Sequence, residues 1–428
     1  MLENIIWHIK KRKRLYFFLH KIYIPFREFL TKNDHLFYFV LILKSLSIKN
    51  FKFASYKLIT FKAFCQLRKT RYFVIEEEQP RKALIPHYYG SQEDEIIQEY
   101  ISPEIYLAEV FDANIVGANG FVLANKHCLL DMALSKKKAR YDLRYQSLKR
   151  IEKNEVLIEY NFSGIEYSEG ILLCGFAPHN YFHITLELLS RLQYIDNFEE
   201  FRSLPILIDE IVFEIPQFSD LFNIINKHNH LVIPIKCNSM YKIHKLIFPS
   251  YNTWMPINLK EGIEFEPEDT IIAISAVKHI RESVFENLKI SNAEGFRKIF
   301  ISRKNQDNSR LTNEWDVISL FRSKGFEIVF PEELSFIEQV ELFGQAKYIV
   351  GATGAAFTNI IYCPDNAEII CIIPKEYKFY LYSTLCHLLK LKCIFLDAKI
   401  VSKEKYISVE KFKMDLDYCE NFILQLED

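Results

Sequence analysis

Glycine and proline are scarce in this sequence, and cysteine occurs without any paired pattern. The 428 residues contain 12 Gly and 14 Pro, which excludes a collagen-like or low-complexity protein. The 9 Cys are scattered, with no C-x-x-C pair and no Cys/His spacing suited to zinc, so we expect no structural zinc site. A reducing, cytoplasmic setting explains such cysteines best.

Long apolar runs and two familiar motifs are also missing. The most apolar run, residues 35–43, is too short to cross a bilayer as a helix, which takes roughly 20 apolar residues. No cleavable apolar core with a small-residue exit follows the charged start, so we expect no secretory signal. No strand is followed by G-x-G-x-x-G, which disfavours a nucleotide-dependent epimerase or dehydrogenase.

What remains is the composition of a folded protein with an uneven charge. The chain is 49% hydrophobic and 25% charged, and it is long enough for two domains with a substantial core in each. A net charge of -1 hides an asymmetry, because residues 1–72 hold 16 Lys and Arg against 3 Asp and Glu. This imbalance predicts an anionic partner for the amino-terminal segment alone.

Residues 1–75 interleave basic clusters with aromatic and aliphatic residues. Basic helices with bulky apolar faces lie at membrane surfaces, so we predict that residues 1–46 attach the protein peripherally to an anionic, cytoplasmic membrane face. The alternative is a helical extension packed on the body, with a solvated basic face. Binding to nucleic acid is not expected, because the basic residues sit among large aliphatic residues rather than in a recognisable fold.

The middle of the chain indicates alternating strands and helices. Residues 171–176 form an apolar run typical of a buried strand, and an apolar-periodic helix follows over residues 181–195. On that helix His183, Glu187 and Arg191 share one face. Open α/β sheets bind ligands at the carboxyl ends of their strands, where His183 is expected; the alternative is a solvated ladder of charged residues.

The last third has the clearest pattern, because apolar runs alternate with helical segments. This alternation predicts a parallel, doubly wound sheet with right-handed crossovers. The predicted strands are Thr270–Ser275, Lys298–Ser302, Glu327–Phe330, Tyr348–Val350, Glu368–Ile373 and Cys393–Leu396. Residues 252–268 contain few apolar residues and several turn formers, and they are the predicted linker.

Small residues break the chain directly after the predicted strand at residues 348–350. The sequence Gly351-Ala-Thr-Gly-Ala-Ala356 leads into a helical segment, and small residues at a helix start let backbone N–H groups approach a negatively charged ligand. This turn is a candidate binding site for a nucleotide diphosphate. The alternative is a tight strand-to-helix turn that binds nothing.

Three ordered blocks of residues resemble the glycosyltransferase family 61 group, whose bacterial members are often linked to capsule or lipopolysaccharide synthesis. The blocks are residues 180–192, beginning Asn-Tyr-Phe-His; residues 302–314, with Ser302-Arg303, Arg310 and Asn313-Glu314; and residues 331–359. Together they lie within a resemblance that runs from about residue 101 to residue 374.

The resemblance implies a GT-B architecture, an α/β fold with two Rossmann-like domains facing a cleft. Residues 1–75 are then a basic helical extension, residues 76–262 the acceptor domain and residues 263–428 the nucleotide-sugar domain. The implied activity is metal-independent, inverting transfer of a sugar from a nucleotide-sugar donor to a growing bacterial surface glycan, with no cofactor. The alternative function is that of a catalytically inactive relative, which serves as a membrane-associated scaffold or glycan-binding protein.

The residues suit this chemistry, because a departing diphosphate needs fixed donors or cations when no persuasive D-x-D pair is present. Arg303 and Arg310 suit planar contact with phosphate, although both are also plausible surface arginines. Glu338 also completes a Ser-x-x-Glu capping box with Ser335, and Asn359 also suits a purely structural role. The expected donor-binding residues are Arg303, Arg310, Asn313, Glu338, Gln339, Thr353, Gly354, Ala355 and Asn359.

Inversion also needs a base that accepts the proton of the acceptor hydroxyl. We predict His183 in this role, with Glu187 as the group that orients it or as an alternative base. Two positions depart from the family pattern: Thr353 replaces a common His, and Cys371 stands near a common Glu. Threonine donates a hydrogen bond but carries no charge near pH 7, so these changes put the donor or the activity in question.

Overall fold

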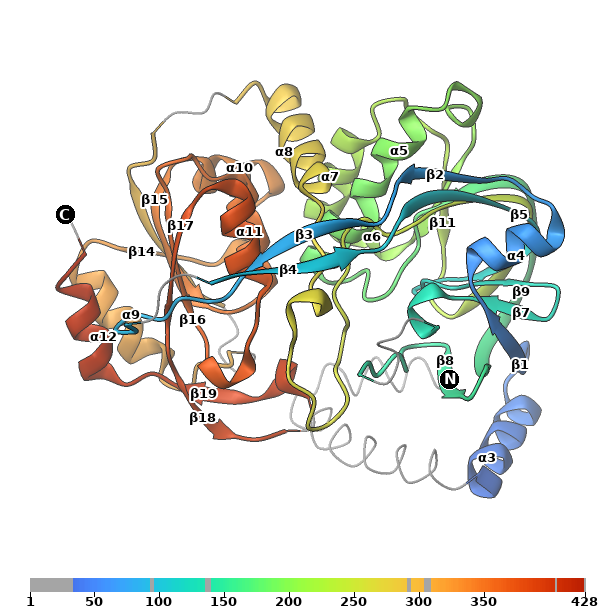
Figure 1. Ribbon diagram of the computed structural model, residues 1–428, viewed down its shortest axis with the longest axis horizontal. Coiled ribbons are helices and arrows are strands. Elements are labelled where there is room, and N and C mark those ends of the chain that lie inside the picture. Colours follow the sequence, from blue (N-terminus) through green and yellow to red (C-terminus); the bar gives the residue numbers. More distant parts are fainter. Residues whose placement is uncertain are drawn as a thin grey trace.

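The computed structural model describes residues 34–426, apart from residues 93–95, 135–139, 291–293, 304–308 and 405. Two β-sheets lie next to each other, each with helices packed around it, and the larger sheet belongs to the first half of the chain (Figure 1). One continuous hydrophobic core joins the halves, because Leu173 and Ile206 of the first half cluster with Val350 and Ile370 of the second.

The larger sheet has ten strands in the order β1-β7-β6-β5-β12-β9-β10-β11, with β2 paired to β5 and β8 to β9. Its strands are β1 (Phe51–Ile59), β2 (Tyr72–Glu76), β5 (Ile105–Val116), β6 (Val122–Ala124), β7 (His127–Leu129), β8 (Leu148–Glu152), β9 (Glu155–Leu172), β10 (Ile206–Asp209), β11 (Val232–Ile235) and β12 (Ser239–Pro249). Strands β12, β9, β10 and β11 are parallel neighbours.

The expected Rossmann-like sheet accounts for only part of this half. The other pairings are antiparallel except for β1 with β7. Three of the antiparallel pairs are hairpins, β5–β6, β6–β7 and β8–β9, whereas β1–β9, β2–β5 and β5–β12 join strands that are far apart in the sequence. Helices cover the parallel block: α5 (Leu192–Asp196), α6 (Ile211–Glu214) and α7 (Pro216–Ile225).

Residues 1–75, expected to form a helical extension, contribute two strands to the larger sheet. Strand β1 pairs with β9, β2 pairs with β5, and α4 (Phe61–Arg68) connects β1 to β2. Helix α3 (Asp34–Ser47) packs on this sheet through Phe37 and Leu41, which contact Phe51 and Leu157. The basic residues of the first 33 positions lie outside the described residues, so the structure does not test the prediction for them.

The second half contains the expected parallel sheet, in the order β14-β13-β15-β16-β17. Its strands are β13 (Arg297–Ile301), β14 (Glu327–Val329), β15 (Ala346–Ala352), β16 (Glu368–Ile372) and β17 (Lys392–Leu396), and its helices are α9 (Glu314–Ser323), α10 (Phe336–Gly344), the 3₁₀ helix η8 (Ala355–Tyr362), α11 (Leu381–Leu389) and α12 (Leu416–Ile423). The strand predicted at residues 270–275 is wrong, because α8 (Ile274–Leu288) begins there.

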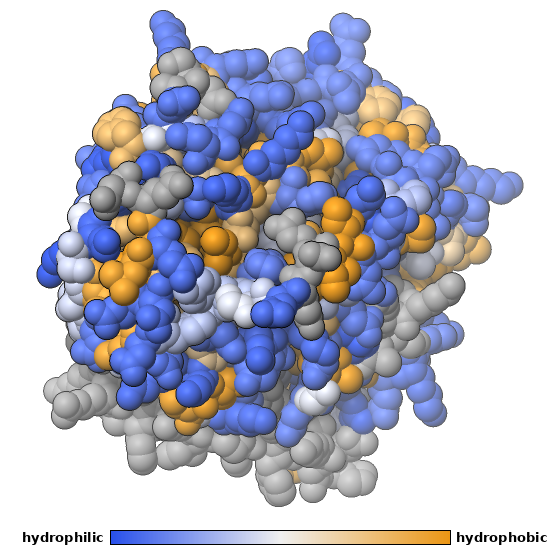
Figure 2. Space-filling view, turned by 60° about the vertical axis from the view of Figure 1, so that its left-hand side comes forward, coloured by the Kyte–Doolittle hydropathy of each residue, from blue (hydrophilic) through white to orange (hydrophobic). Residues whose placement is uncertain are grey.

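Two hairpins complete the fold. Strands β18 (Lys399–Ser402) and β19 (Lys411–Lys413) lie beside the second sheet, and strands β3 (Gln79–Leu84) and β4 (Ile97–Ser102) extend from the larger sheet towards β17 (Figure 1). Hydrogen bonds from Leu84 to Thr384 and from Ser383 to Leu84 fix the far end of β3 on α11. Figure 2, in which the second half of the chain is turned forward, shows a largely hydrophilic surface with separate, small apolar patches.

Candidate functional site

Two adjoining cavities lie between the halves, at the carboxyl ends of β13, β15 and β16. The first, of about 740 Å³, has aromatic walls and is called the aromatic cavity; the second, of about 650 Å³, is called the polar cavity. Both are lined by Asn180, Arg303, Arg310, Thr353, Gly354 and Ala355. Residues from opposite halves of the chain, predicted from separate sequence blocks, therefore meet at one place.

Arg303 and Gly354 form the centre of this shared region. Arg303 follows β13, Gly354 follows β15, and these two strands are parallel neighbours. A Cβ atom at Gly354 would lie 3.1 Å from Nη2 of Arg303, so the guanidinium group rests directly against the turn. The hydroxyl of Tyr382, on α11, donates a hydrogen bond to the carbonyl oxygen of Gly354 and so holds the turn in place. The predicted pair is thus brought together, and a side chain at position 354 would make a tight contact with the end of the Arg303 side chain.

Arg310 lines both cavities but also anchors the carboxyl-terminal hairpin. Its guanidinium donates to the carbonyl oxygens of Glu410 (3.1 Å) and Ile407 (2.6 Å), and it lies over the rings of Tyr377 and Phe412. Burial lowers the pKa of Arg310. Because these contacts use only part of its five N–H donors, Arg310 retains capacity for a ligand.

Asn313 and Glu338 serve the fold rather than the cavities. The side chain of Asn313 receives the N–H of Met414 and donates to the carbonyl oxygen of the same residue, so both of its polar atoms are engaged. Glu338 accepts hydrogen bonds from the N–H and hydroxyl of Ser335, and these bonds lower the pKa of its carboxyl group. Neither residue lines either cavity, so the structure does not bring these two expected donor-binding residues together with the others.

Gln339 and Asn359 line the polar cavity as a hydrogen-bonded pair. Nδ2 of Asn359 donates to Oε1 of Gln339 at 2.9 Å, and Nε2 of Gln339 donates to the carbonyl oxygen of Pro331. Oδ1 of Asn359 accepts a hydrogen bond from the hydroxyl of Tyr181. Both expected ligands are therefore present in the wall, held in a fixed orientation by protein partners.

His183 and Glu187 form a buried pair behind the wall of the cavities. Nδ1 of His183 lies 2.7 Å from Oε2 of Glu187, and Oε1 of Glu187 accepts the N–H of Met255 at 2.7 Å. Among the described residues, no hydrogen bond engages Nε2 of His183. Neither residue lines a cavity, although Asn180 and Phe182, just before them, do.

The helix that carries this pair has a wide turn that the sequence did not predict. Residues His183–Leu188 form the π-helix η2, followed by a 3₁₀ turn over Leu189–Arg191. Arg191 consequently points away from the cleft and is fully buried, donating to the carbonyl oxygens of Cys174 and Pro249. The expected stripe of three ionisable residues is thus reduced to two, and π-turns occur frequently at functional sites.

His179 is a cavity residue that the sequence did not identify. It lines the polar cavity, and its Nδ1 lies 3.4 Å from the hydroxyl of Tyr145. Partial loss of hydration and the nearby His183 lower the pKa of His179, which favours the neutral imidazole. Its position directly after a buried strand was the available signal. Glu314, at the start of α9, also lines this cavity and accepts a hydrogen bond from Ser302.

The two departures from the family pattern differ in their surroundings. Thr353 lines both cavities, and its N–H is bonded to the carbonyl oxygen of Ile372. Cys371, on β16, is fully buried in the middle of the sheet between Gly351 of β15 and Phe395 of β17. The side chain of Thr353 also contacts the thiol of Cys371, so the two departures are neighbours, with Thr353 at the cavity wall and Cys371 in the core behind it.

Residues 181–370 match the family model of glycosyltransferase 61. The match spans less than half of the chain, from the start of the helix with the His183–Glu187 pair to strand β16. It includes Arg303, Arg310 and the Gly354 turn, and it begins one residue after Asn180. No characterised protein gives a significant match. The matched domain makes the protein a glycosyltransferase, which implies a nucleotide-sugar donor and a glycan acceptor.

Proposed function

We propose that this glycosyltransferase is an inverting, metal-independent enzyme that binds a nucleoside-diphosphate sugar in a GT-B-like cleft. The observation that carries the proposal is the meeting of Arg303 and the Gly354 turn with His179 and Asn180 around one cavity. The diphosphate and the attacking hydroxyl must lie on opposite sides of the reacting carbon in an inverting transfer, and these two groups of residues come from opposite halves of the chain.

The departing diphosphate is held by Arg303 and by the backbone at the start of η8. A guanidinium group matches phosphate oxygens with paired N–H donors, and the N–H groups at a helix start add positive potential. Donors that already point at the position of the departing group stabilise the charge that develops there in the transition state. Arg310 adds a second positive charge at the same place.

The two cavities differ in lining, and this difference supports placing the nucleobase of the donor in one cavity and its sugar in the other. The aromatic cavity offers the rings of Phe265, Phe379 and Tyr382 for packing against a nucleobase. The polar cavity offers His179, Glu314, Gln339 and Asn359, whose groups exchange hydrogen bonds with sugar hydroxyls.

The base that activates the acceptor is assigned to His183, with Glu187 as its orienting partner. A carboxylate at Nδ1 fixes the tautomer and leaves Nε2 to accept a proton. Because His183 lies behind the wall, its ring must gain access through movement of Phe182 or of the segment around Met255. His179, which already faces the polar cavity, is the second candidate.

The acceptor is proposed to be a growing bacterial surface polysaccharide, of the capsule or lipopolysaccharide class, at the cytoplasmic face of the membrane. Within the described residues, no helix has the length and apolarity to cross a membrane. Helix α3 supports peripheral attachment, because Phe39, Leu43 and Leu46 leave 55%, 47% and 80% of their surface exposed. An exposed apolar stripe of this kind, preceded by basic residues, suits an anionic lipid surface.

The proposal is tested with a panel of nucleotide sugars. Release of free nucleotide is followed with and without glycan acceptors, in the presence and absence of EDTA, and the anomeric configuration of the product is read by NMR. The expected result is release with one class of nucleoside-diphosphate sugar, inversion, and no effect of EDTA. Absence of calorimetric binding to any nucleotide or nucleotide sugar would falsify the proposal.

A further inference from the structure

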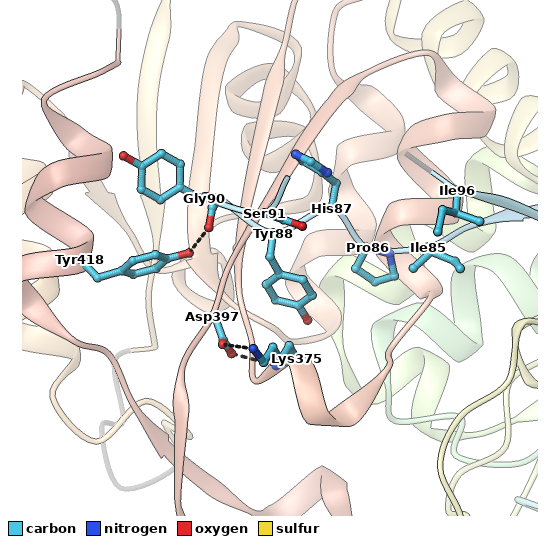
Figure 3. A pocket seen from close by; sticks show the side chains of 11 residues that line it. Ile85, Pro86, His87, Tyr88, Gly90, Ser91, Ile96, Lys375, Asp397 and Tyr418 are labelled. Carbon is cyan, nitrogen blue, oxygen red and sulfur yellow. Dashed lines mark hydrogen bonds and ion pairs between the residues drawn. The ribbon is translucent and has the colours of Figure 1, made fainter. Parts of the chain in front are cut away.

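A third cavity, of about 400 Å³, lies beyond the turn that follows β16 (Figure 3). We call it the tyrosine pocket, because Tyr88, Tyr89 and Tyr418 contribute to its wall. Lys375 lines this pocket, whereas the next two residues, Glu376 and Tyr377, line the aromatic cavity. A three-residue turn therefore separates the pocket from the proposed donor site.

The wall of the tyrosine pocket is held by backbone hydrogen bonds. The segment after β3 adds to the edge of the second sheet, because the N–H of Tyr89 donates to Phe395 and the N–H of Phe395 donates to His87, both at 2.9 Å. The hydroxyl of Tyr418 donates to the carbonyl oxygen of Tyr89 at 2.9 Å (Figure 3). These bonds preform the pocket, which reduces the cost of ordering it around a ligand.

Two features indicate the chemistry of a ligand. First, the hydroxyl of Tyr88 is buried and, within the described residues, has no hydrogen-bond partner. Second, Lys375 and Asp397 provide a donor and an acceptor: the carboxylate receives the N–H of Lys375 at 3.0 Å, and the ammonium group lies 3.8 Å from its other oxygen. An unpaired buried hydroxyl in a native structure calls for a partner, and a loosely paired ion pair still has hydrogen-bonding capacity.

The charge balance favours a neutral ligand over an anion. Asp397 offsets the charge of Lys375 at close range, so phosphate would meet a carboxylate together with the ammonium group. Convergent hydroxyl, carboxylate and ammonium groups next to aromatic rings suit a molecule with many hydroxyls and apolar C–H faces. A saccharide has this combination, since the negative face of an aromatic ring attracts C–H groups.

We propose that the tyrosine pocket binds a neutral saccharide unit of the acceptor, remote from the end that reacts. The proposal rests on the proposed function, because it takes the acceptor to be a glycan. Since only one turn lies between the pocket and the proposed donor site, an acceptor with several sugar units extends from the reaction site past the bound donor to the pocket, while a short acceptor engages the reaction site alone. The pocket then sets the preference for acceptor length.

The test compares variants that remove single contacts. Tyr88→Phe deletes only the unpartnered hydroxyl, and Lys375→Met removes a side chain with 65% of its surface exposed. Lys392→Met is the matched control, because this lysine is 75% exposed and also paired with a carboxylate, but lies at the opposite end of the sheet. Each full-length variant is titrated with neutral oligosaccharides of increasing length, and with inorganic phosphate, in the absence of donor.

For the longest oligosaccharide that binds, each pocket variant is expected to lower the affinity about tenfold, which is the effect of losing one hydrogen bond. Lys392→Met is expected to bind this oligosaccharide with the wild-type affinity. Turnover with a short acceptor stays at the wild-type level. Equal affinity in all variants, no oligosaccharide binding at all, or stronger binding of phosphate overturns the pocket assignment. Failure of every protein to bind a nucleotide sugar instead overturns the proposed function, so the two failures are distinguishable.

Discussion

The hydroxyl of Tyr181 donates a 2.8 Å hydrogen bond to Oδ1 of Asn359, and this bond joins the two halves of the chain across the polar cavity. Tyr181 directly precedes the His183–Glu187 segment, while Asn359 belongs to η8 behind the Gly354 turn. The bond continues through Asn359 to Gln339. The position of the proposed base is thereby tied to the position of the proposed phosphate site.

Loss of the Tyr181 hydroxyl should weaken this connection. In Tyr181→Phe, the buried Oδ1 of Asn359 loses its partner, and we expect a decrease of about 1–3 kcal/mol in the free energy of unfolding. Urea unfolding measures the change, with Tyr38→Phe, an exposed tyrosine on α3, as the control. Equal stability of the two variants would contradict a contribution from this bond.

Removal of the Arg303 side chain should affect the chemical step. Arg303→Ala is expected to lower kcat by about 10²–10³, the range for loss of one preorganised charge-stabilising donor. Arg303→Lys keeps the charge without the paired donors and should recover only part of the activity. Nucleotide release is the measurement, and exposed Arg322→Ala on α9 is the control. Wild-type turnover in Arg303→Ala would remove the residue from the mechanism.

The two histidines can be separated by kinetics. His183→Ala should lower turnover by roughly 10²–10⁴, the usual contribution of a general base, and Glu187→Gln should reduce it less, because the imidazole remains. The lowered pKa of His179 keeps this residue neutral down to a lower pH than an ordinary histidine. If His179→Gln, rather than His183→Ala, abolishes the acidic limb of the pH–rate profile, the base is His179.

Asp209 should make stability depend on pH. It is fully buried in the larger sheet and accepts the N–H groups of Ala118 and Gly175, and burial raises its pKa from 3.8 to about 7. The folded state therefore binds this proton more tightly than the unfolded chain does. The resulting stability is fully present below about pH 4 and is lost as the pH rises through about 7.

The variant Asp209→Asn does not titrate, so its free energy of unfolding should fall less between pH 4 and pH 7 than that of the wild type, by up to about 1.4 kcal/mol per pH unit. Urea unfolding at several pH values measures the two slopes. Exposed Asp220→Asn is the control. If the free energy of unfolding changed with pH in the same way in Asp209→Asn and in the wild type, the Asp209 carboxylate would not be the cause of the pH dependence.

Charge on the exposed face of α3 should prevent membrane attachment. Phe39→Glu and Leu43→Glu change exposed side chains and leave the buried contacts of Phe37 and Leu41 intact, so the fold should be retained. Flotation with anionic liposomes is expected to show a loss of binding in both variants. Leu231→Glu, on a residue that is 71% exposed elsewhere, is the control. Undiminished flotation of the α3 variants would exclude this face as the membrane contact.

Features encoded in short stretches could be predicted from the sequence. The alternation of apolar runs with helical segments identified the parallel sheet of the second half, and the capping box of Ser335 and Glu338 is present as its spacing indicated. Arg303 and the Gly354 turn could be paired because both directly follow strands of one parallel sheet, whose carboxyl ends share an edge.

Features that depend on distant contacts could not be predicted in this way. Asn313 is engaged by Met414, about 100 positions further along the chain, and no local pattern distinguishes such a residue from a ligand. The π-turn at His183 was missed because an apolar pattern with helical spacing does not reveal one extra residue in a turn. The antiparallel pairings of β1 with β9 and of β5 with β12 were missed because these strands pair across large sequence separations, whereas residues 105–130 form hairpins, as the short apolar runs in this stretch indicate.

The β3–β4 hairpin restricts how the enzyme can open to exchange substrates and products. Both of its strands leave the larger sheet within a few residues of β2 and β5, and its far end is hydrogen-bonded to Ser383 and Thr384 on α11, in the second half of the chain. A movement that separates the two halves must therefore either break the hydrogen bonds at Leu84 or carry the β3–β4 hairpin along with the second half.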